Sequence, residues 1–387
     1  MSVPDFPFAA RLVSMRAVME EMGLDTFVVS HPPNVFYVSG FSGSAGALVV
    51  DKGMCGLVVD SRYITAARDL PRSHPALSTM QVFLAERSED ETILEILKSR
   101  PRQRIGIEAA WMPVLRFNRL SAALAAGEIS TPLASRPPCP VLVPTERVVE
   151  QLRLIKDNVE VAVLREAAGR LSRAASHVVL ELLRPGRTEA EVAAGIDAEL
   201  RKAGFQRSAF ETIVASGPNS ALPHARPGPR VLQQSDAVVL DFGGVYDGYC
   251  VDLTRTVQLP PSTPEFRRLF AAVAEAHGAA IAAVRPGTLT TDIDLAARRA
   301  LERHGLGEAF GHGTGHGLGL EVHEGPRISK ADPARPAHPV SAGMVFTIEP
   351  GVYLPGIGGV RIEDDVLVAD GACEVLTTVP IELHVHS

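Results

Sequence analysis

Short apolar runs alternate with amphipathic stretches through the first 140 residues of the chain. The runs have the length and composition of β-strands, and they cover Thr26 to Ser30, Ala47 to Val50, Gly56 to Asp60, Gln81 to Phe83 and Arg104 to Glu108. Helical periodicity is found at Ala9 to Met22, Glu91 to Lys98 and Val114 to Ala125. Strands that alternate with helices predict a mixed or mostly parallel sheet with helices on its faces.

Two segments of this part show little periodicity. Residues Asn34 to Gly46, NVFYVSGFSGSAG, are rich in glycine, serine and aromatic side chains, and both a turn-rich connection and a binding loop fit them. Residues Arg136 to Glu146, RPPCPVLVPTE, hold four prolines, which predicts an extended linker. We therefore expect an α/β domain over residues 1–140 and a second domain over residues 141–387.

The second part of the chain repeats a pattern of helices. The pattern predicts two pairs of helices, at Asn158–Leu183, Thr188–Lys202, Pro264–Val284 and Thr291–His304. In both pairs the helices are separated by Arg-Pro-Gly, at 184–186 and 285–287, and β-type runs follow each pair. The repeat indicates an internal duplication. Two α/β halves that face each other would put a site in the crevice between them.

Two aspartates, Asp241 and Asp252, lie in the apolar segment VVLDFGGVYDGYCVDLTRTV, where apolar neighbours disfavour a solvated acidic face. Asp247-Gly248 predicts a type I′ hairpin turn between them. With this turn, Asp241 pairs with Thr254, and Asp252 is its diagonal neighbour on the same face. A loop shifted back by one residue would pair the aspartates directly, and a three-residue loop would put them on opposite faces. Like charges on one face are destabilising without a cation.

Histidines and glutamates follow further along the chain. The stretch Gly311 to Glu324, GHGTGHGLGLEVHE, has three histidines among five glycines. It fits either a flexible loop or a site where the backbone lies close to a group that the imidazoles bind. Glu349 and Glu363 lie in apolar β-type runs, where a buried carboxylate is costly unless it is paired or bound to metal. One histidine with four carboxylates suits divalent cations. The four carboxylates carry a charge of about −4, which two such divalent ions would neutralise, and shared carboxylates hold two ions about 3.5–4 Å apart.

The bulk composition narrows the class of protein. The chain has 387 residues, 46% hydrophobic and 21% charged, with a net charge of −7, so we expect a globular protein that binds neither nucleic acid nor a membrane. No apolar stretch approaches the ~20 residues of a membrane span, and the N-terminus lacks the apolar region of a signal peptide. Four scattered cysteines indicate free thiols, and we expect a cytoplasmic location.

The motifs resemble, in sequence and in order, those of one enzyme family. LDFGG, YDGYCVDLTRT, GHGTGHGLGLEVHE, FTIEPG and GVRIEDD, with SGPNSALPHA at 216–225, are similar to motifs of the M24 metallopeptidases, the superfamily of methionine aminopeptidase, aminopeptidase P and prolidase. The resemblance covers Leu152 to Pro380 and implies an α+β pita-bread catalytic domain with a pseudo-twofold duplication. Residues 1–140 resemble the creatinase-type N-terminal domain, with a mixed sheet, of the proline-specific branch.

The resemblance implies a metal site with two divalent ions. Its ligands would be Asp241, Asp252, His316, Glu349 and Glu363. Asp252 and Glu363 would be shared by both ions, with a water or hydroxide bridging them. Glu349 would also act as the general base that takes a proton from this water. Mn²⁺ is the first expectation, with Co²⁺, Zn²⁺ or Fe²⁺ as alternatives.

The resemblance also implies residues that act on the substrate. His224 and His323 match residues that contact the scissile peptide and stabilise the tetrahedral intermediate. His312 and Arg361 match positions around the metal ligands, and we assign them to substrate binding. Arg327, in HEGPRIS, matches an arginine of prolidases that pairs with the C-terminal carboxylate of the substrate, and an ordinary loop arginine is the equal alternative.

We therefore expect a metal-dependent peptidase that cleaves the Xaa-Pro bond of dipeptides or short proline peptides. A prolidase is favoured over an aminopeptidase P that acts on longer peptides. The family implies a homodimer. A metal-free creatinase-like enzyme and a binding protein without catalysis are the other interpretations, and the intact set of five ligand positions argues against both.

Overall fold

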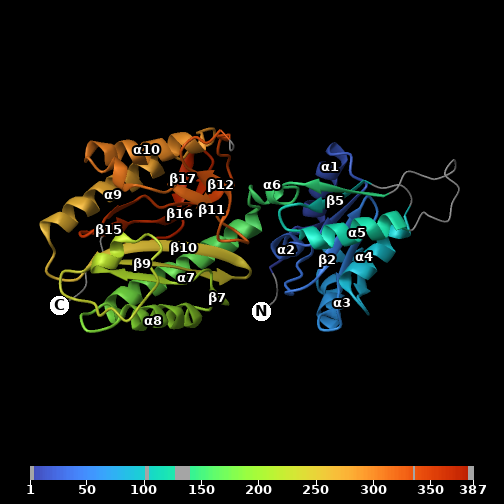
Figure 1. Ribbon diagram of the computed structural model, residues 1–387, viewed down its shortest axis with the longest axis horizontal. Helices are drawn as coiled ribbons and strands as arrows, with labels where there is room; N and C mark the ends of the chain where they lie inside the picture. The colour runs from blue at the N-terminus through green and yellow to red at the C-terminus, as the bar shows by residue number, and fades with distance from the viewer. Residues whose placement is uncertain (1–3, 101–103, 127–139, 334–335, 382–387) are drawn as a thin grey trace. The chain divides into compact units, whose positions relative to one another are not determined.

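The computed structural model describes residues 4–100, 104–126, 140–333 and 336–381. Contacts between residues divide the chain into two compact units, Met1–Arg153 and Leu154–Ser387 (Figure 1). Each unit builds its own sheets and hydrophobic core. None of the helices in the described ranges is both long and apolar enough to cross a membrane.

A six-stranded mixed sheet forms the centre of the first unit, in the order β4-β3-β2-β1-β5-β6. Its strands are β1 (Thr26–Val29), β2 (Ala47–Asp51), β3 (Cys55–Val59), β4 (Gln81–Leu84), β5 (Arg104–Glu108) and β6 (Val141–Thr145). Strand β1 is parallel to β5, β5 to β6 and β3 to β4, whereas β2 is antiparallel to its neighbours β1 and β3. This topology confirms the predicted α/β class.

Helices surround this sheet. They are α1 (Phe8–Glu21), α2 (Pro32–Ser39), α3 (Ile64–Ser73), α4 (Glu89–Lys98), α5 (Val114–Ala126) and α6 (Glu150–Arg153), with a 3₁₀ helix η1 (Pro75–Leu77). Apolar side chains of α4 and α5, such as Ile93 and Leu120, pack on one face of the sheet against Val28 and Ile105. The periodicity of α1, α4 and α5 is therefore explained by one buried face on each helix.

Strand β6 corrects the prediction of a linker at 136–146. It pairs in parallel with β5, and Leu142 packs in the core of the first unit. Pro144 is tolerated because β6 is the edge strand of the sheet. The first unit therefore extends past residue 140, where the sequence pattern placed the domain boundary. Cys139 and the linker residues before it lie outside the described residues.

Helix α2 lies in the segment that the sequence leaves open between a turn-rich connection and a binding loop. Its start has Pro32 at the first helical position, and the Glu108 carboxylate accepts hydrogen bonds from the backbone N–H groups of Ser30 and His31 at 2.6 and 2.7 Å. Gly40, at φ 71°, ends the helix. Because this cap comes from a distant strand, the local pattern does not reveal the helix. Helix α3 is likewise absent from the predicted pattern.

Two pairs of helices flank the strands of the second unit, with α7 and α8 on one side and α9 and α10 on the other (Figure 1). The helices are α7 (Asn158–Leu182), α8 (Glu189–Lys202), α9 (Pro264–Ala283) and α10 (Thr290–Arg303), with 3₁₀ helices η3 (Gly217–Ala221) and η4 (Gly307–Ala309). All four predicted helices are confirmed to within one residue at each end.

The strands of the second unit form three sheets. They are β7 (Arg207–Ser208), β8 (Ile213–Ser216), β9 (Ala237–Tyr246), β10 (Tyr249–Gln258), β11 (Gly315–Gly317), β12 (Glu324–Ile328), β13 (Val345–Ile348), β14 (Gly351–Leu354), β15 (Gly358–Arg361), β16 (Asp364–Ala369) and β17 (Ala372–Val375). The first sheet follows β10-β9-β7 with β8 on β9, the second has the order β12-β11-β13-β16-β17, and β14 pairs with β15.

The two halves of this unit repeat each other in their loop contacts. Gly186 and Gly287, the last residues of the two Arg-Pro-Gly triplets, both have a positive φ, at 96° and 89°. The backbone N–H of Gly186 donates to Leu232 at 3.0 Å, and that of Gly287 donates to Val340 at 2.8 Å. Matching contacts at matching positions support the predicted duplication.

The hairpin of β9 and β10 has the predicted turn. Asp247 and Gly248 form a two-residue loop with φ values of 46° and 87°, as a type I′ turn requires. Asp241 pairs with Thr254, which confirms the first of the three registers considered. Asp252 therefore lies diagonally from Asp241 on the same face of the hairpin.

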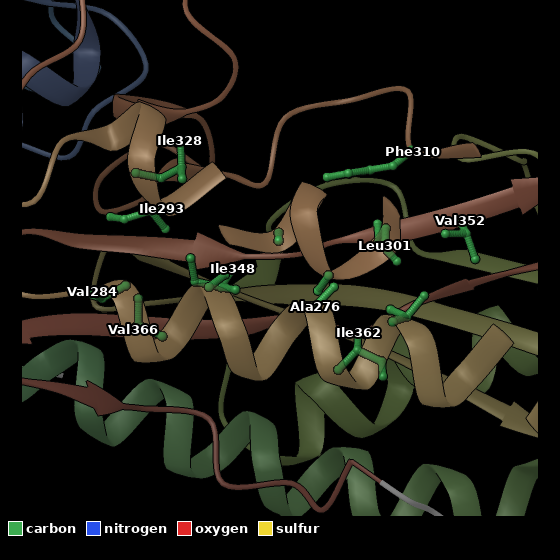
Figure 2. Close-up of a cluster of buried hydrophobic side chains, with 14 of the residues drawn as sticks. Ala276, Val284, Ile293, Leu301, Phe310, Ile328, Ile348, Val352, Ile362 and Val366 are labelled. Carbon is green, nitrogen blue, oxygen red and sulfur yellow. The ribbon is translucent and has the colours of Figure 1, made fainter. Parts of the chain in front are cut away.

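A large apolar cluster joins α9 and α10 to the second sheet (Figure 2). Ala276 and Leu301 lie on the two helices, Ile348 and Val366 lie on the paired strands β13 and β16, and all four are fully buried. The cluster fixes the sheet on the helices. It therefore also fixes the ends of β13 and β16, where two of the predicted acidic residues lie.

Leu301→Ala tests this packing. Removal of a fully buried leucine side chain should lower the free energy of unfolding of the second unit by about 2–5 kcal/mol. The control Leu295→Ala, on the same helix but 38% exposed, should change it by less than about 1 kcal/mol. Urea unfolding followed by circular dichroism measures the change, while fluorescence of Trp111, the single tryptophan, reports on the first unit. Equal losses in the two variants would contradict the packing.

Candidate metal centre and active site

The predicted metal ligands come from both halves of the second unit. They lie on β9, β10 and β11, directly after β13 and directly before β16, and they are Asp241, Asp252, His316, Glu349 and Glu363. Strand β13 is hydrogen-bonded to β11 and to β16, so three of these positions share one sheet. A bridge between Thr254 and Glu363 joins this sheet to β10, and the Thr254 hydroxyl donates to Glu363 Oε2 at 2.6 Å. The bridge brings ligands of the two halves together.

The ligand atoms lie close to one another. Asp252, His316 and Glu363 each offer one ligand atom, and these atoms lie within 4.8 Å of one another. His316 Nε2 lies 4.0 Å from Asp252 Oδ2 and 3.6 Å from Glu349 Oε1. Asp241 Oδ1 and Asp252 Oδ1 are buried and accept no hydrogen bond from a described residue. Buried carboxylate oxygens of this kind fit a cation, because burial without a partner is costly.

Burial and mutual repulsion determine the protonation of the cluster. Burial raises the pKa of Asp252 and of Glu363 well above the usual range, and neighbouring carboxylates raise both further. Burial also raises the pKa of Glu349 to about 8, against the opposing charge of Arg361. Burial lowers the pKa of His316 to about 4, so its imidazole is neutral and able to bind a metal. The donor set therefore fits divalent ions such as Mn²⁺, Co²⁺, Zn²⁺ or Fe²⁺.

Contacts from neighbouring elements hold the histidine-rich stretch in place. A Cβ at Gly315 would overlap a carbonyl oxygen of β13, so only glycine allows this approach of β11. Asp294 of α10 accepts hydrogen bonds from the N–H and hydroxyl of Thr314, at 3.2 and 2.8 Å. Arg298 of α10 donates to the carbonyl of His312 at 2.5 Å. The stretch is therefore an anchored segment and not the flexible loop that its glycines also allow.

A chain of hydrogen bonds links Asp241 to His312. Arg361 donates to Asp241 Oδ2 at 2.5 Å and to the Tyr353 hydroxyl at 2.7 Å. Because a guanidinium only donates, the Tyr353 hydroxyl is able to donate onward to His312 Nε2, which lies 3.0 Å away. The other ring nitrogen of His312 lies 2.8 Å from the Gly313 carbonyl. Burial lowers the pKa of His312 to about 4, and a neutral ring is what this arrangement requires.

The residues predicted to act on the substrate lie around this cluster. The ring centroids of His323 and His316 are 4.3 Å apart. Arg327 is exposed and is the cross-strand partner of His316. Burial lowers the pKa of His323, and the charges of Arg327 and His224 contribute to the shift. His224 itself lies in an exposed turn after η3. The roles of these side chains towards a substrate stay predictions, as does that of Arg361.

Two residues that position this site were missed in the sequence. Tyr353 follows Glu349 in an apolar run, and the run gives no sign that its hydroxyl joins a hydrogen-bond chain. Glu189 has the position of an ordinary acid in the first turn of a helix, but it is fully buried. It accepts hydrogen bonds from backbone N–H groups at both ends of the loop 216–228, at 2.8 and 3.2 Å. This loop carries His224, so Glu189 anchors it.

The fold and the cluster define the class of the protein as one with a site for divalent metal ions. Comparison with known families agrees with this class. The metallopeptidase family M24 matches residues 162–370, and the creatinase/prolidase N-terminal domain matches residues 11–155. The chain therefore belongs to the metallopeptidase family M24.

Similar proteins support this assignment over the whole chain. The Xaa-Pro dipeptidase of Pyrococcus furiosus is 32% identical over 376 residues, which cover 96% of this chain and 99% of that protein. The structure of the Xaa-Pro dipeptidase from Bacillus anthracis has a TM-score of 0.88 and 32% identity, over 98% of this chain and 100% of that one. The X-Pro aminopeptidase from Thermotoga maritima has a TM-score of 0.83 and 32% identity, over 96% and 100%. The predicted family, fold and metallopeptidase class are confirmed.

The neutral state of His312 predicts a dependence of stability on pH. A histidine with a lowered pKa contributes stability above pH 6.5 that is lost as the pH falls towards 4, because only the unfolded chain binds the proton readily. In metal-free protein, His312→Gln should therefore lose less stability than wild type between pH 6.5 and 4.5, by about 2 kcal/mol. Urea unfolding at a series of pH values measures this slope. The same slope in both proteins would contradict a neutral His312.

Proposed function

We propose that the protein is a metal-dependent peptidase that hydrolyses the Xaa-Pro bond of dipeptides or short peptides. The observation that carries the proposal is the buried cluster in which ligand atoms of Asp252, His316 and Glu363 lie within 4.8 Å of one another. With Asp241 and Glu349 the cluster offers four carboxylates, whose charge of about −4 would be neutralised by two divalent ions. The Xaa-Pro dipeptidases among the similar proteins support this substrate class.

Different residues of the cluster and its surroundings would act in different steps of hydrolysis. Two divalent ions, when bound, would polarise the scissile carbonyl and lower the pKa of a water molecule. Glu349 would accept a proton from the attacking water and deliver it to the departing proline nitrogen. Its side chain is 19% exposed, against 6% for Asp252, so it is the more accessible of the two carboxylates. Hydrogen bonds from His224 and His323 would stabilise the charge that develops on the carbonyl oxygen.

Arg327 bears on the length of the substrate. A dipeptide such as Ala-Pro has a carboxylate directly after the cleaved bond, where a longer peptide has a neutral amide. Arg327 is exposed and pairs across the strands with His316, and its guanidinium would form charge-assisted hydrogen bonds with such a carboxylate. This favours a dipeptidase. An aminopeptidase P that acts on longer peptides remains the second candidate, because the X-Pro aminopeptidase from Thermotoga maritima is also 32% identical to this chain.

The finer expectations about this peptidase stay predictions. They are Mn²⁺ as the first choice of metal, a homodimer and a cytoplasmic location. A metal-free creatinase-like enzyme and a binding protein without catalysis are disfavoured, since all five ligand positions are occupied by ligating residues. Metal content separates these classes, because only the proposed peptidase requires two ions per chain.

Asp252→Asn tests the metal site. A carboxylate shared by two ions contributes to both, so the variant should bind fewer than two ions per chain and hydrolyse Ala-Pro at least ~100-fold more slowly than the wild type. Mass spectrometry of the metal content and hydrolysis of Ala-Pro by Mn²⁺-loaded protein measure the two effects. Asp247→Asn is the matched control, because it makes the same exchange in the hairpin turn, where asparagine is tolerated. Full metal content and activity in Asp252→Asn would remove this residue from the site.

Arg327→Ala tests the preference for dipeptides. Hydrogen bonds to a charged group contribute about 1.5–3 kcal/mol, which corresponds to a preference of roughly 10- to 150-fold in kcat/KM. Wild type should therefore prefer Ala-Pro over Ala-Pro-amide, and Arg327→Ala should lose most of this preference while it keeps both metal ions. Measurement of kcat/KM for both substrates with both proteins shows whether Arg327 causes the preference. A preference that survives in the variant would assign selectivity elsewhere, and no preference in wild type would favour the aminopeptidase P.

A further inference from the structure

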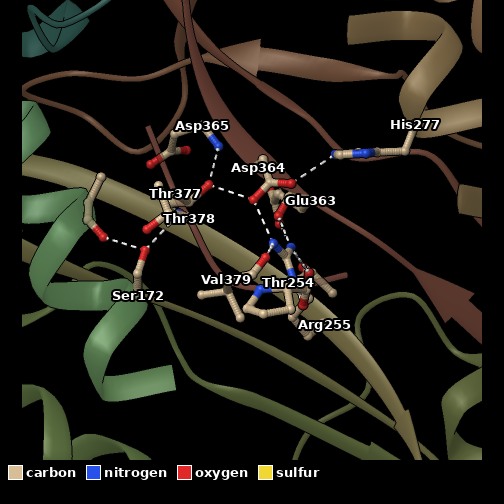
Figure 3. A network of polar contacts seen from close by, with 12 residues as sticks. Ser172, Thr254, Arg255, His277, Glu363, Asp364, Asp365, Thr377, Thr378 and Val379 are labelled. Atoms are coloured by element: carbon tan, nitrogen blue, oxygen red, sulfur yellow. Dashed lines mark hydrogen bonds and ion pairs between the residues drawn. The ribbon is translucent and has the colours of Figure 1, made fainter. Parts of the chain in front are cut away.

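A buried arginine lies at the contact between β10, the strand of Asp252, and Glu363, which directly precedes β16 (Figure 3). Arg255 of β10 is 1% exposed. Each of its five N–H groups has an acceptor, namely the carbonyls of Thr254 (3.0 Å), Glu363 (2.6 Å), Val379 (2.6 Å) and Pro380 (3.2 Å) and the carboxylate of Asp364 (2.7 Å). Two of these acceptors belong to the bridge that joins the two sheets. The guanidinium therefore holds both residues of this bridge through their main-chain carbonyls.

The carboxylates that follow Glu363 extend the network (Figure 3). Asp364 Oδ1 also accepts from the Thr377 hydroxyl at 2.6 Å, and Asp364 Oδ2 lies 3.1 Å from His277 Nε2 on α9. Asp365 Oδ2 accepts a hydrogen bond from the backbone N–H of Asp252 at 3.0 Å. The backbone N–H of Asp365 donates to the Thr377 hydroxyl at 3.1 Å. One threonine hydroxyl thus ties the two aspartates to each other.

Residues 376–380, which we call the C-terminal strap, complete this network. The N–H of Leu376 donates to the carbonyl of Asp365 at 2.8 Å. The N–H of Thr378 donates to the hydroxyl of Ser172 on α7 at 2.9 Å. The last two carbonyls of the strap accept from the buried guanidinium. The strap therefore connects α7 to the strand junction on which two of the candidate metal ligands lie.

We propose that Arg255, Asp364, Asp365 and the C-terminal strap form a clamp that positions Asp252 and Glu363 for metal binding. This inference rests on the proposed function, in which both carboxylates are shared by two ions. The network reaches the two ligand residues through their main chain, at the N–H of Asp252 and the carbonyl of Glu363. These contacts leave their side-chain oxygens to the metal, apart from Glu363 Oε2, which also accepts a hydrogen bond from the Thr254 hydroxyl. Arg255, Asp364, Asp365 and the strap are positioning residues.

Stability alone is a weaker explanation of the network. A buried ion pair contributes little net stability, because apolar side chains of similar volume often do as well or better. Five donors in a rigid plane contribute a defined geometry, and a lysine in place of Arg255 has only three donors on a flexible stem. Metal affinity depends on the positions of the ligands, and partners that hold a ligand are commonly worth 10–100-fold in affinity.

Substitutions in the clamp test the proposal through metal affinity. Thr377→Val removes the hydroxyl but keeps the shape of the side chain, and Arg255→Lys keeps the charge but loses donors. Titration calorimetry of the metal-free full chain with Mn²⁺ should show about 10- to 100-fold weaker binding in both variants. The visible absorption spectrum of Co²⁺-loaded protein, which reports the geometry of the ligands, should also change. Thr377→Ser retains the hydroxyl and should restore the wild-type affinity and spectrum.

Controls separate the clamp from a general loss of stability. Thr145→Val removes a buried hydroxyl that donates to a strand carbonyl in the first unit, at 2.8 Å. Arg230→Lys alters an ion pair with Asp236 in the second unit, at 2.6 Å. Both should retain wild-type metal affinity. Unchanged affinity and spectra in the clamp variants, or equal weakening in the controls, would overturn the clamp. Wild type that binds no metal would instead overturn the proposed function, and the clamp with it.

Discussion

Repulsion between buried carboxylates is the constraint on which the second unit depends. Asp252, Glu363 and Asp365 are 4%, 2% and 0% exposed. Burial raises the pKa of each, and the charges of neighbouring carboxylates raise it further. Such groups are tolerated only where cations, protons or hydrogen-bond donors offset the cost of burial. The donors and helices around the strand junction are therefore best understood as the means by which the fold keeps these carboxylates inside.

The buried arginines Arg361 and Arg255 pair with carboxylates other than those of Asp252 and Glu363. Arg361 pairs with Asp241 on one side, and Arg255 pairs with Asp364 on the other. Neither guanidinium makes a described contact with the side chain of Asp252. An arginine at the centre would neutralise the carboxylates and compete with a metal. The observed placement stabilises the surroundings and leaves the central carboxylates without an arginine partner, as the proposed metal binding would require.

The duplication explains why the site needs both halves. The first half carries two of the five predicted ligand positions, on the β9–β10 hairpin, and the second half carries the other three on or directly beside the strands of a single sheet. The contact between Thr254 and Glu363 is where the two sets meet. Neither half holds the full ligand set. The packing of the helix pairs on their strands therefore matters to the site because it sets the relative position of the two halves.

The sequence by itself determined the features that depend on local pattern: the four long helices, the turn at Asp247-Gly248 and the polar residues that stand out in apolar runs. The register of β9 on β10 was one of three that the sequence allowed, and the structure decided it. Turn residues and hydrophobic periodicity depend on neighbouring positions in the chain, so they can be recognised without a structure. Only the tertiary structure decided the start of α2, which is capped by Glu108, and the roles of Glu189 and Arg255. Arg255 contacts Glu363, 108 residues away. Hydrogen bonds between distant segments leave no periodic trace, because each partner is an ordinary polar residue until the fold brings the two together.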